Sequence, residues 1–146
     1  MCRVVYIAAD RPLPLIPWNP ESPEFHVIEL TDREAPVKSQ FSKTFVYYAG
    51  SHQGCGCAYD LASMSIGHPE ELPDARRSRE ALVRYLREVL DVAGPLELYT
   101  CWDGDWTDPA VQRTTVDPSA LLPEEPWLPE RTFAIVTGAS GRRNVG

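Results

Sequence analysis

The chain has 146 residues, a net charge of −7 and 43% hydrophobic residues, which is enough apolar material for a single α/β domain over 1–146. The excess of acids excludes nucleic acid as the main partner, because binding to a phosphate backbone needs concentrated positive charge. No stretch is apolar and long enough for a signal peptide or a membrane span, so we expect a small soluble, cytoplasmic protein with no membrane partner. The 12 arginines against 2 lysines are typical of a GC-rich bacterial genome.

Six segments have the β-branched, aromatic or alternating composition that is typical of strands. They are 2–9, 25–30, 44–49, 96–102, 111–116 and 131–137. Five prolines between residues 11 and 23 predict an extended coil, because proline lacks the donor that helices and central strands need. Residues 33–41 predict a short helix, and Pro118 predicts one further helical turn.

The main helix is predicted over about 76–93, where Leu82, Leu86 and Val89 follow helical spacing and Gly94 ends the pattern. Five arginines of this region are expected on its outer, solvated face: Arg76, Arg77, Arg79, Arg84 and Arg87. The 18 residues 58–75 are predicted to be a loop, and the residues from about 139 a loose tail.

The alternation of strands and helices predicts a mixed, mostly parallel sheet of five or six strands with one main helix and one or two short helices. Connections 31–43 and 60–95 are long enough for parallel crossovers. Because the carboxyl ends of parallel strands share an edge, we expect segments 50–57 and 101–106 to meet there.

A cluster of glycine and cysteine follows the third predicted strand. Gly50, Gly54 and Gly56 permit positive φ and predict a turn whose amides point inward, an arrangement that stabilises anions and thiolates. Cys-x-Cys is tighter than the usual Cys-x2-Cys pair of zinc sites, and no second local pair exists.

The candidate metal ligands are His52, Cys55, Cys57 and Cys101. Thiol and imidazole donors suit zinc or another thiophilic transition metal, and we expect Cys55 and Cys57 to lie close together, with Cys101 or His52 completing the cluster. Two alternatives remain open: the cysteines are buried apolar residues, or they do thiol redox or nucleophilic chemistry.

Five residues around these ligands are candidates for lining a bound molecule: Ser51, Gln53, Trp102, Asp103 and Asp105. The two aspartates could orient His52, or they are simply solvated acids of a turn. The tryptophan could stack on a ligand or fill the core.

Familiar catalytic templates are absent from the sequence. It contains no dinucleotide-binding glycine fingerprint, no Walker loop, no Cys-x2-Cys redox motif and no Gly-x-Ser-x-Gly elbow. Met1-Cys2 ahead of a strand resembles the start of N-terminal-cysteine amidotransferases, in which processing exposes the thiol nucleophile. Arg3 replaces the glycine that follows the cysteine in that family, and 146 residues are few for its two-sheet sandwich.

Two functions from different classes fit these observations, and no reaction is indicated. The first is a Cys/His site that binds a thiophilic metal or does thiol chemistry. The alternative is an acidic module that binds a basic protein partner without catalysis, supported by the charge of −7, the proline-rich segment and four tryptophans.

Overall fold

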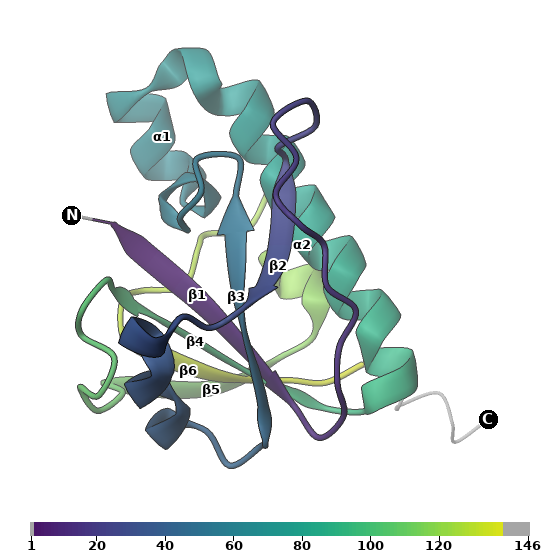
Figure 1. Cartoon of the computed structure of the whole chain (residues 1–146). Helices are drawn as coiled ribbons and strands as arrows, with labels where there is room; N and C mark the ends of the chain where they lie inside the picture. Colours follow the sequence, from purple (N-terminus) through teal and green to yellow (C-terminus); the bar gives the residue numbers. More distant parts are fainter. Residues whose placement is uncertain (1, 139–146) are drawn as a thin grey trace.

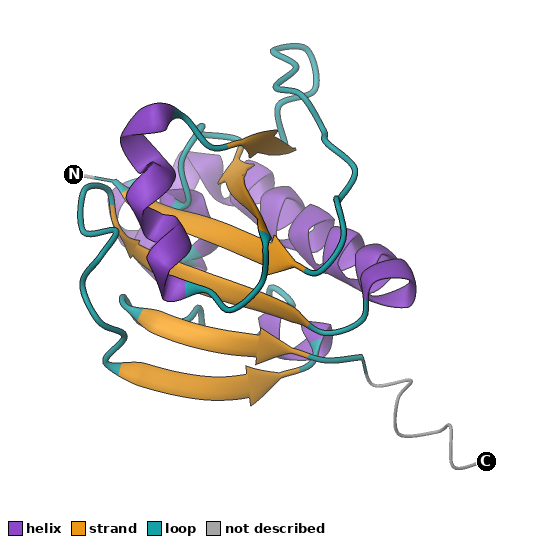
Figure 2. Ribbon diagram, turned by 60° about the horizontal axis from the view of Figure 1, so that its bottom comes forward, coloured by secondary structure: helices purple, strands orange, loops and turns teal. Residues whose placement is uncertain are grey.

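The structure, a computed structural model, describes residues 2–138, so the predicted tail from about 139 lies outside the described residues. Its centre is a six-stranded sheet in the order β2-β3-β1-β4-β6-β5 (Figures 1 and 2). The strands are β1 (Arg3–Ala9), β2 (Phe25–Glu29), β3 (Phe45–Ser51), β4 (Leu96–Trp102), β5 (Gln112–Val116) and β6 (Thr132–Val136). All six lie within two residues of the segments expected from composition and alternation.

The sheet is mixed but mostly antiparallel, which corrects the prediction of a mostly parallel sheet. Of the five strand pairs formed by the described residues, β5–β6 is the parallel one. The strands β3 and β4 do run parallel to each other, but β1 lies between them and is antiparallel to both. The connection between β2 and β3 returns antiparallel, so the length of a connection did not determine the direction of the strand after it.

Helices cover both faces of the sheet (Figure 2). On one face, α2 (Leu72–Ala93) packs against alternate residues of β1, Val5, Ile7 and Ala9. On the other, the 3-10 helix η1 (Asp32–Gln40) brings Val37 onto the opposite set of β1 side chains. The remaining helices are η2 (Cys57–Tyr59), α1 (Leu61–Gly67), η3 (Pro69–Glu71) and η4 (Pro118–Leu121).

The segment 58–75, predicted to be a loop, is largely helical. It contains most of η2, all of α1 and η3, and the first turn of α2, which begins at Leu72 rather than near 76. Within residues 2–138, no helix combines the length and apolar character needed to cross a membrane.

Arg79 is fully buried, which corrects its placement on the solvated face of the main helix. Its guanidinium donates hydrogen bonds of 2.6–2.9 Å to the carbonyl oxygens of Tyr59, Leu121, Leu122 and Glu125. Burial lowers the pKa of Arg79 to about 10, so it stays protonated at neutral pH. A single side chain of α2 thereby satisfies carbonyl groups at the end of η2 and at and after the end of η4.

We predict that Arg79→Ala lowers the free energy of unfolding by about 3–5 kcal/mol, because it removes a buried, charge-assisted hydrogen-bond network. Urea denaturation at neutral pH measures the loss. Arg84→Ala, on the same helix but largely exposed, is the matched control and should change stability by no more than about 0.5 kcal/mol. Equal effects of the two substitutions would contradict a structural role for the buried guanidinium.

Candidate functional site

Three chain segments meet at one edge of the sheet: the carboxyl ends of β3 and β4 and the amino end of β1 between them (Figure 1). The amide of Gly56 donates to the carbonyl oxygen of Arg3 at 2.8 Å, and the amide of Asp103 donates to that of Cys2 at 2.7 Å. The turns after β3 and β4 therefore both bind the start of β1. The expected convergence of segments 50–57 and 101–106 on one edge is found, although β1 separates their strands.

The turn after β3 is closed by hydrogen bonds of its own residues. The amide and the hydroxyl of Ser51 both donate to the carbonyl oxygen of Cys55, at 2.8 and 2.5 Å. The amide of Gly54 donates to the carbonyl oxygen of Ser51 at 2.9 Å, and Gly54 has a φ of 88°, the left-handed region that favours glycine. These hydrogen bonds fix the position of the Cys55 main chain at the end of the turn.

Gly50 and Gly56 are not in the positive-φ conformation expected of all three glycines of this segment. Their role is close approach: a Cβ on Gly56 would lie 3.2 Å from the carbonyl oxygen of Arg3, and one on Gly50 would overlap the imidazole of His26. Glycine at 56 therefore lets the turn lie against β1, and this contact places the next residue, Cys57, beside the amide of Arg3.

Cys2, Cys55 and Cys57 form a cluster in which all three sulfur atoms lie within 4.8 Å of one another. Cys55 and Cys57 are half-buried, whereas Cys2 is exposed. The closeness of Cys55 and Cys57 agrees with the expectation from the Cys-x-Cys spacing. Cys2 was not predicted to join this cluster, because it has no neighbouring cysteine in the sequence.

The pKa of Cys57 is lowered to about 5, chiefly by hydrogen bonding from the Cys55 thiol and also by the Arg3 amide, whose nitrogen lies 3.2 Å from the sulfur. The Cys2 thiol and the positive charge of Arg3 lower it further. The pKa of Cys55 is raised, because its thiol donates to Cys57 and is partly buried. Within the cluster the thiolate is therefore favoured on Cys57, where the other two cysteines and one amide lower its pKa. The amide comes from β1, not from the glycine turn as expected.

Cys101 lies on β4 opposite Val4 and is fully buried in an apolar cluster that includes Tyr6, Tyr99 and Phe133. Burial is the main reason that its pKa is raised to about 12, with nearby aspartates adding to the shift. It is not part of the group of three close sulfur atoms. The structure thus places Cys101 at the expected edge but within the core.

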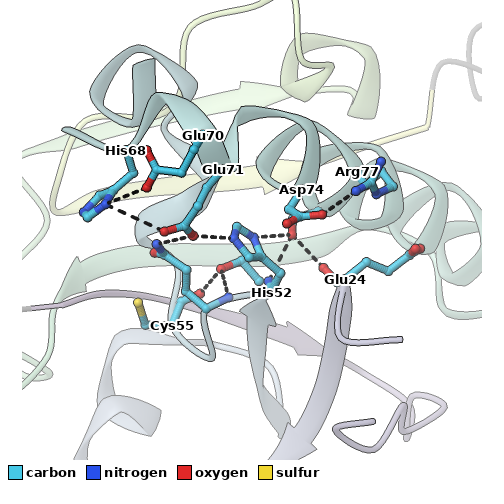
Figure 3. A network of polar contacts seen from close by, with 11 residues as sticks. Glu24, His52, Cys55, His68, Glu70, Glu71, Asp74 and Arg77 are labelled. Atoms are coloured by element: carbon cyan, nitrogen blue, oxygen red, sulfur yellow. Dashed lines mark hydrogen bonds and ion pairs between the residues drawn. The ribbon is translucent and has the colours of Figure 1, made fainter. Parts of the chain in front are cut away.

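His52 faces away from the thiols and contacts the helical side of the site (Figure 3). Its Nε2 lies 2.8 Å from Glu71 Oε1, and its amide donates to Ser78 Oγ at 3.0 Å. Gln53 Nε2 donates to the same oxygen of Glu71 at 3.0 Å, and these two contacts lower the pKa of Glu71. His52 and Gln53 therefore hold the turn against η3 and α2 and do not join the cysteine cluster.

The Ser78–His52–Glu71 arrangement has the residue types of a hydrolytic triad but not its geometry. Ser78 is fully buried, and its hydroxyl donates to the carbonyl oxygen of Glu24 at 2.7 Å. Its oxygen lies 3.4 Å from His52 Nδ1, but the buried hydroxyl is inaccessible to a substrate. The contacts of His52 are accounted for by fixing the turn.

The candidate lining residues at the end of β4 and in the turn after it mostly contact protein groups. Asp103 forms an ion pair with Arg33 at 3.2 Å, and the Arg3 guanidinium lies 6.0 Å from the centre of the Trp102 ring. The amide of Asp105 closes the turn on the carbonyl oxygen of Trp102. Asp103 alone of these three also lines a groove beside the thiols.

No protein-family model, curated protein or solved structure matches the chain. Its function is therefore argued from the geometry of the site.

We predict that iodoacetamide modifies Cys57 of the metal-free protein already at neutral pH, with a rate that rises through about pH 5 and then levels, because the thiolate is the reactive form. Peptide mass spectrometry after timed quenching measures the rate. Cys55→Ala removes the largest stabilising contact and should move the rise toward the usual range of about 8.5. Buried Cys101 is the internal control and should stay unmodified while the protein is folded. A profile unchanged in Cys55→Ala would contradict the assigned cause.

Proposed function

We propose that the protein binds a thiophilic metal ion through Cys2, Cys55 and Cys57. The observation that carries the proposal is the mutual approach of the three sulfur atoms to within 4.8 Å. A tetrahedral zinc ion with Zn–S distances of about 2.3 Å holds its sulfur ligands roughly 3.8 Å apart, so each sulfur pair needs to approach by at most about 1 Å. The exposed position of Cys2 supplies a path for the ion.

The charge of the site favours a divalent ion such as zinc. Three thiolates around a divalent ion leave one negative charge, and the positive charge of Arg3 is close enough to lower the pKa of Cys57. Soft thiolates also disfavour magnesium and calcium, which prefer oxygen ligands.

We predict one zinc ion per chain after purification without a polyhistidine tag or chelator. Elemental analysis and competition with a chromogenic chelator measure the content and the affinity. Each of Cys2→Ser, Cys55→Ser and Cys57→Ser should weaken binding by about a hundredfold or more, because a coordinating thiolate is lost. Cys101→Ala keeps the three ligands and is the control that should bind like the native protein. Metal-free protein that also fails to take up added zinc would overturn the proposal.

Uptake of the ion should release at least one proton per chain at pH 7, because the pKa of Cys55 is raised and its thiol must lose a proton to bind the ion. Calorimetric titration in two buffers of different ionisation enthalpy measures the number. Affinity should therefore rise with pH through the neutral range and fall as pH is lowered, with a steeper loss below about pH 5, where Cys57 also becomes protonated. Release of no protons would mean that the ion is held by other residues.

Thiol chemistry without metal is the second candidate, and the low pKa of Cys57 beside Cys55 supports it. Loss of two hydrogens to a disulfide oxidant would join the two cysteines and lower the native mass accordingly. Native mass spectrometry with and without reductant separates the two candidates: a bound ion adds mass that a chelator removes, whereas a disulfide is reversed by reductant alone.

The tryptophans lend little support to the alternative of a basic protein partner. Trp106 donates to the Tyr6 hydroxyl at 3.0 Å, Trp127 is buried beside Arg79, and Trp102 lies under Arg3. Trp18, on the proline-rich segment, is 44% exposed and is the one of the four among the exposed large hydrophobic residues. Most of the expected aromatic anchors are thus used inside the fold.

A further inference from the structure

A groove of about 530 Å³ lies directly beside the thiol cluster. Cys2 and Cys55 form part of its wall, and the side chains of Val4, Ile28 and Tyr48 supply much of the rest. Its volume is in the range of sites for small molecules. Two of the three cysteines therefore border a space that a small ligand can enter.

The polar groups of the groove are already paired with protein groups. Glu34 accepts hydrogen bonds from the Tyr6 hydroxyl at 2.8 Å and from the amide and hydroxyl of Thr31 at 3.0 Å. Arg33 contacts both carboxylate oxygens of Asp103 at 3.2–3.4 Å. An entering ligand thus meets apolar side chains, cysteines and charged groups that are already paired with one another or with the protein.

The described residues supply three thiols to the cluster and no fourth ligand. His52 is engaged with Glu71, and Cys101 is buried in the core. Cys57 lies against β1 through the amide of Arg3, so the side of the cluster that remains open is the side of Cys2 and Cys55, toward the groove. A zinc site with three protein ligands keeps a fourth position for water or a substrate.

We propose that this groove binds a small organic thiol with an apolar body, whose sulfur takes the fourth position on the metal. The inference rests on the proposed metal site. A fourth sulfur suits a position next to three thiolates, and the hydrocarbon part of the ligand contacts Val4, Ile28 and the ring of Tyr48. On binding, the thiol loses its proton to solvent, a sulfur–metal bond forms, and a bound water leaves.

Cobalt(II) is the probe metal for the test, because its visible bands shift and intensify as sulfur replaces oxygen in a tetrahedral site. We expect the cobalt-loaded protein to show bands of a three-sulfur site, and benzyl mercaptan to convert them saturably to those of a four-sulfur site. Benzyl alcohol has the same apolar body without sulfur and should leave the spectrum unchanged. Metal content after gel filtration checks that the thiol has not extracted the ion.

Ile28→Trp fills the groove from the edge strand β2 and should weaken benzyl mercaptan binding by about tenfold or more without changing the cobalt spectrum in the absence of thiol. The matched control is Ile135→Trp at a 41% exposed position on β6, and it should bind the thiol like the native protein. Equal binding by both variants would overturn the groove as the location.

The outcomes distinguish the two proposals. Protein that takes up no cobalt overturns the metal site itself. Protein that takes up cobalt but shows no spectral change with benzyl mercaptan, or loses its cobalt to the thiol, overturns the thiol proposal and leaves the metal site standing. The same spectral change with benzyl alcohol would overturn coordination by the ligand's sulfur.

Discussion

The main chain at the start of β1 is the contact on which the whole site depends. Arg3 donates its amide to the sulfur of Cys57 and accepts from the amide of Gly56, while the preceding carbonyl group accepts from Asp103. A half-buried thiolate needs donors, and backbone donors cost no side-chain entropy to position. Because β1 is the inner strand between β3 and β4, these donors are as rigid as the sheet itself. The thiol cluster is thus an extension of the sheet's hydrogen bonding rather than a feature of a free loop.

The positions of the strands and of the main helix could be predicted from the sequence, because burial on a strand or a helix leaves a periodic trace in composition. The directions of the strands could not. A connection such as 31–43 has the length of a crossover, yet η1 uses that length to cover one face before the chain returns antiparallel. Which strands become neighbours of β1 is decided by packing across the whole sheet, and nothing local to Arg3–Ala9 records it.

The candidate site could also be predicted only in part, because local sequence shows some of its features but not the packing of the strands. Two predictions were correct: Cys55 and Cys57 lie close together, and the carboxyl ends of β3 and β4 share an edge. The first follows from the Cys-x-Cys spacing and the second from the parallel relation of the two strands. Cys2 was not predicted to join the cluster, because it directly precedes β1, and the sequence does not show that β1 lies between β3 and β4. Cys101 was expected among the ligands, but it lies within β4, where it is opposite Val4 and packs into the apolar cluster. Arg79 was assigned to solvent because helical periodicity does not show the carbonyl groups of η2 and η4 that it satisfies.

Cys57 and Cys101 show how strongly surroundings separate chemically identical side chains. The pKa of one falls to about 5 through thiol and amide donors, and that of the other rises to about 12 through burial near acids. The first is suited to binding a cation and the second to packing. A metal held by the cluster would also join Cys2, at the start of the central strand, to a turn more than fifty residues away. Because the unfolded chain does not hold these segments together, the free energy of metal binding would add to the stability of the fold. The bound ion would hold the start of β1 and the turn after β3 together at this edge of the sheet.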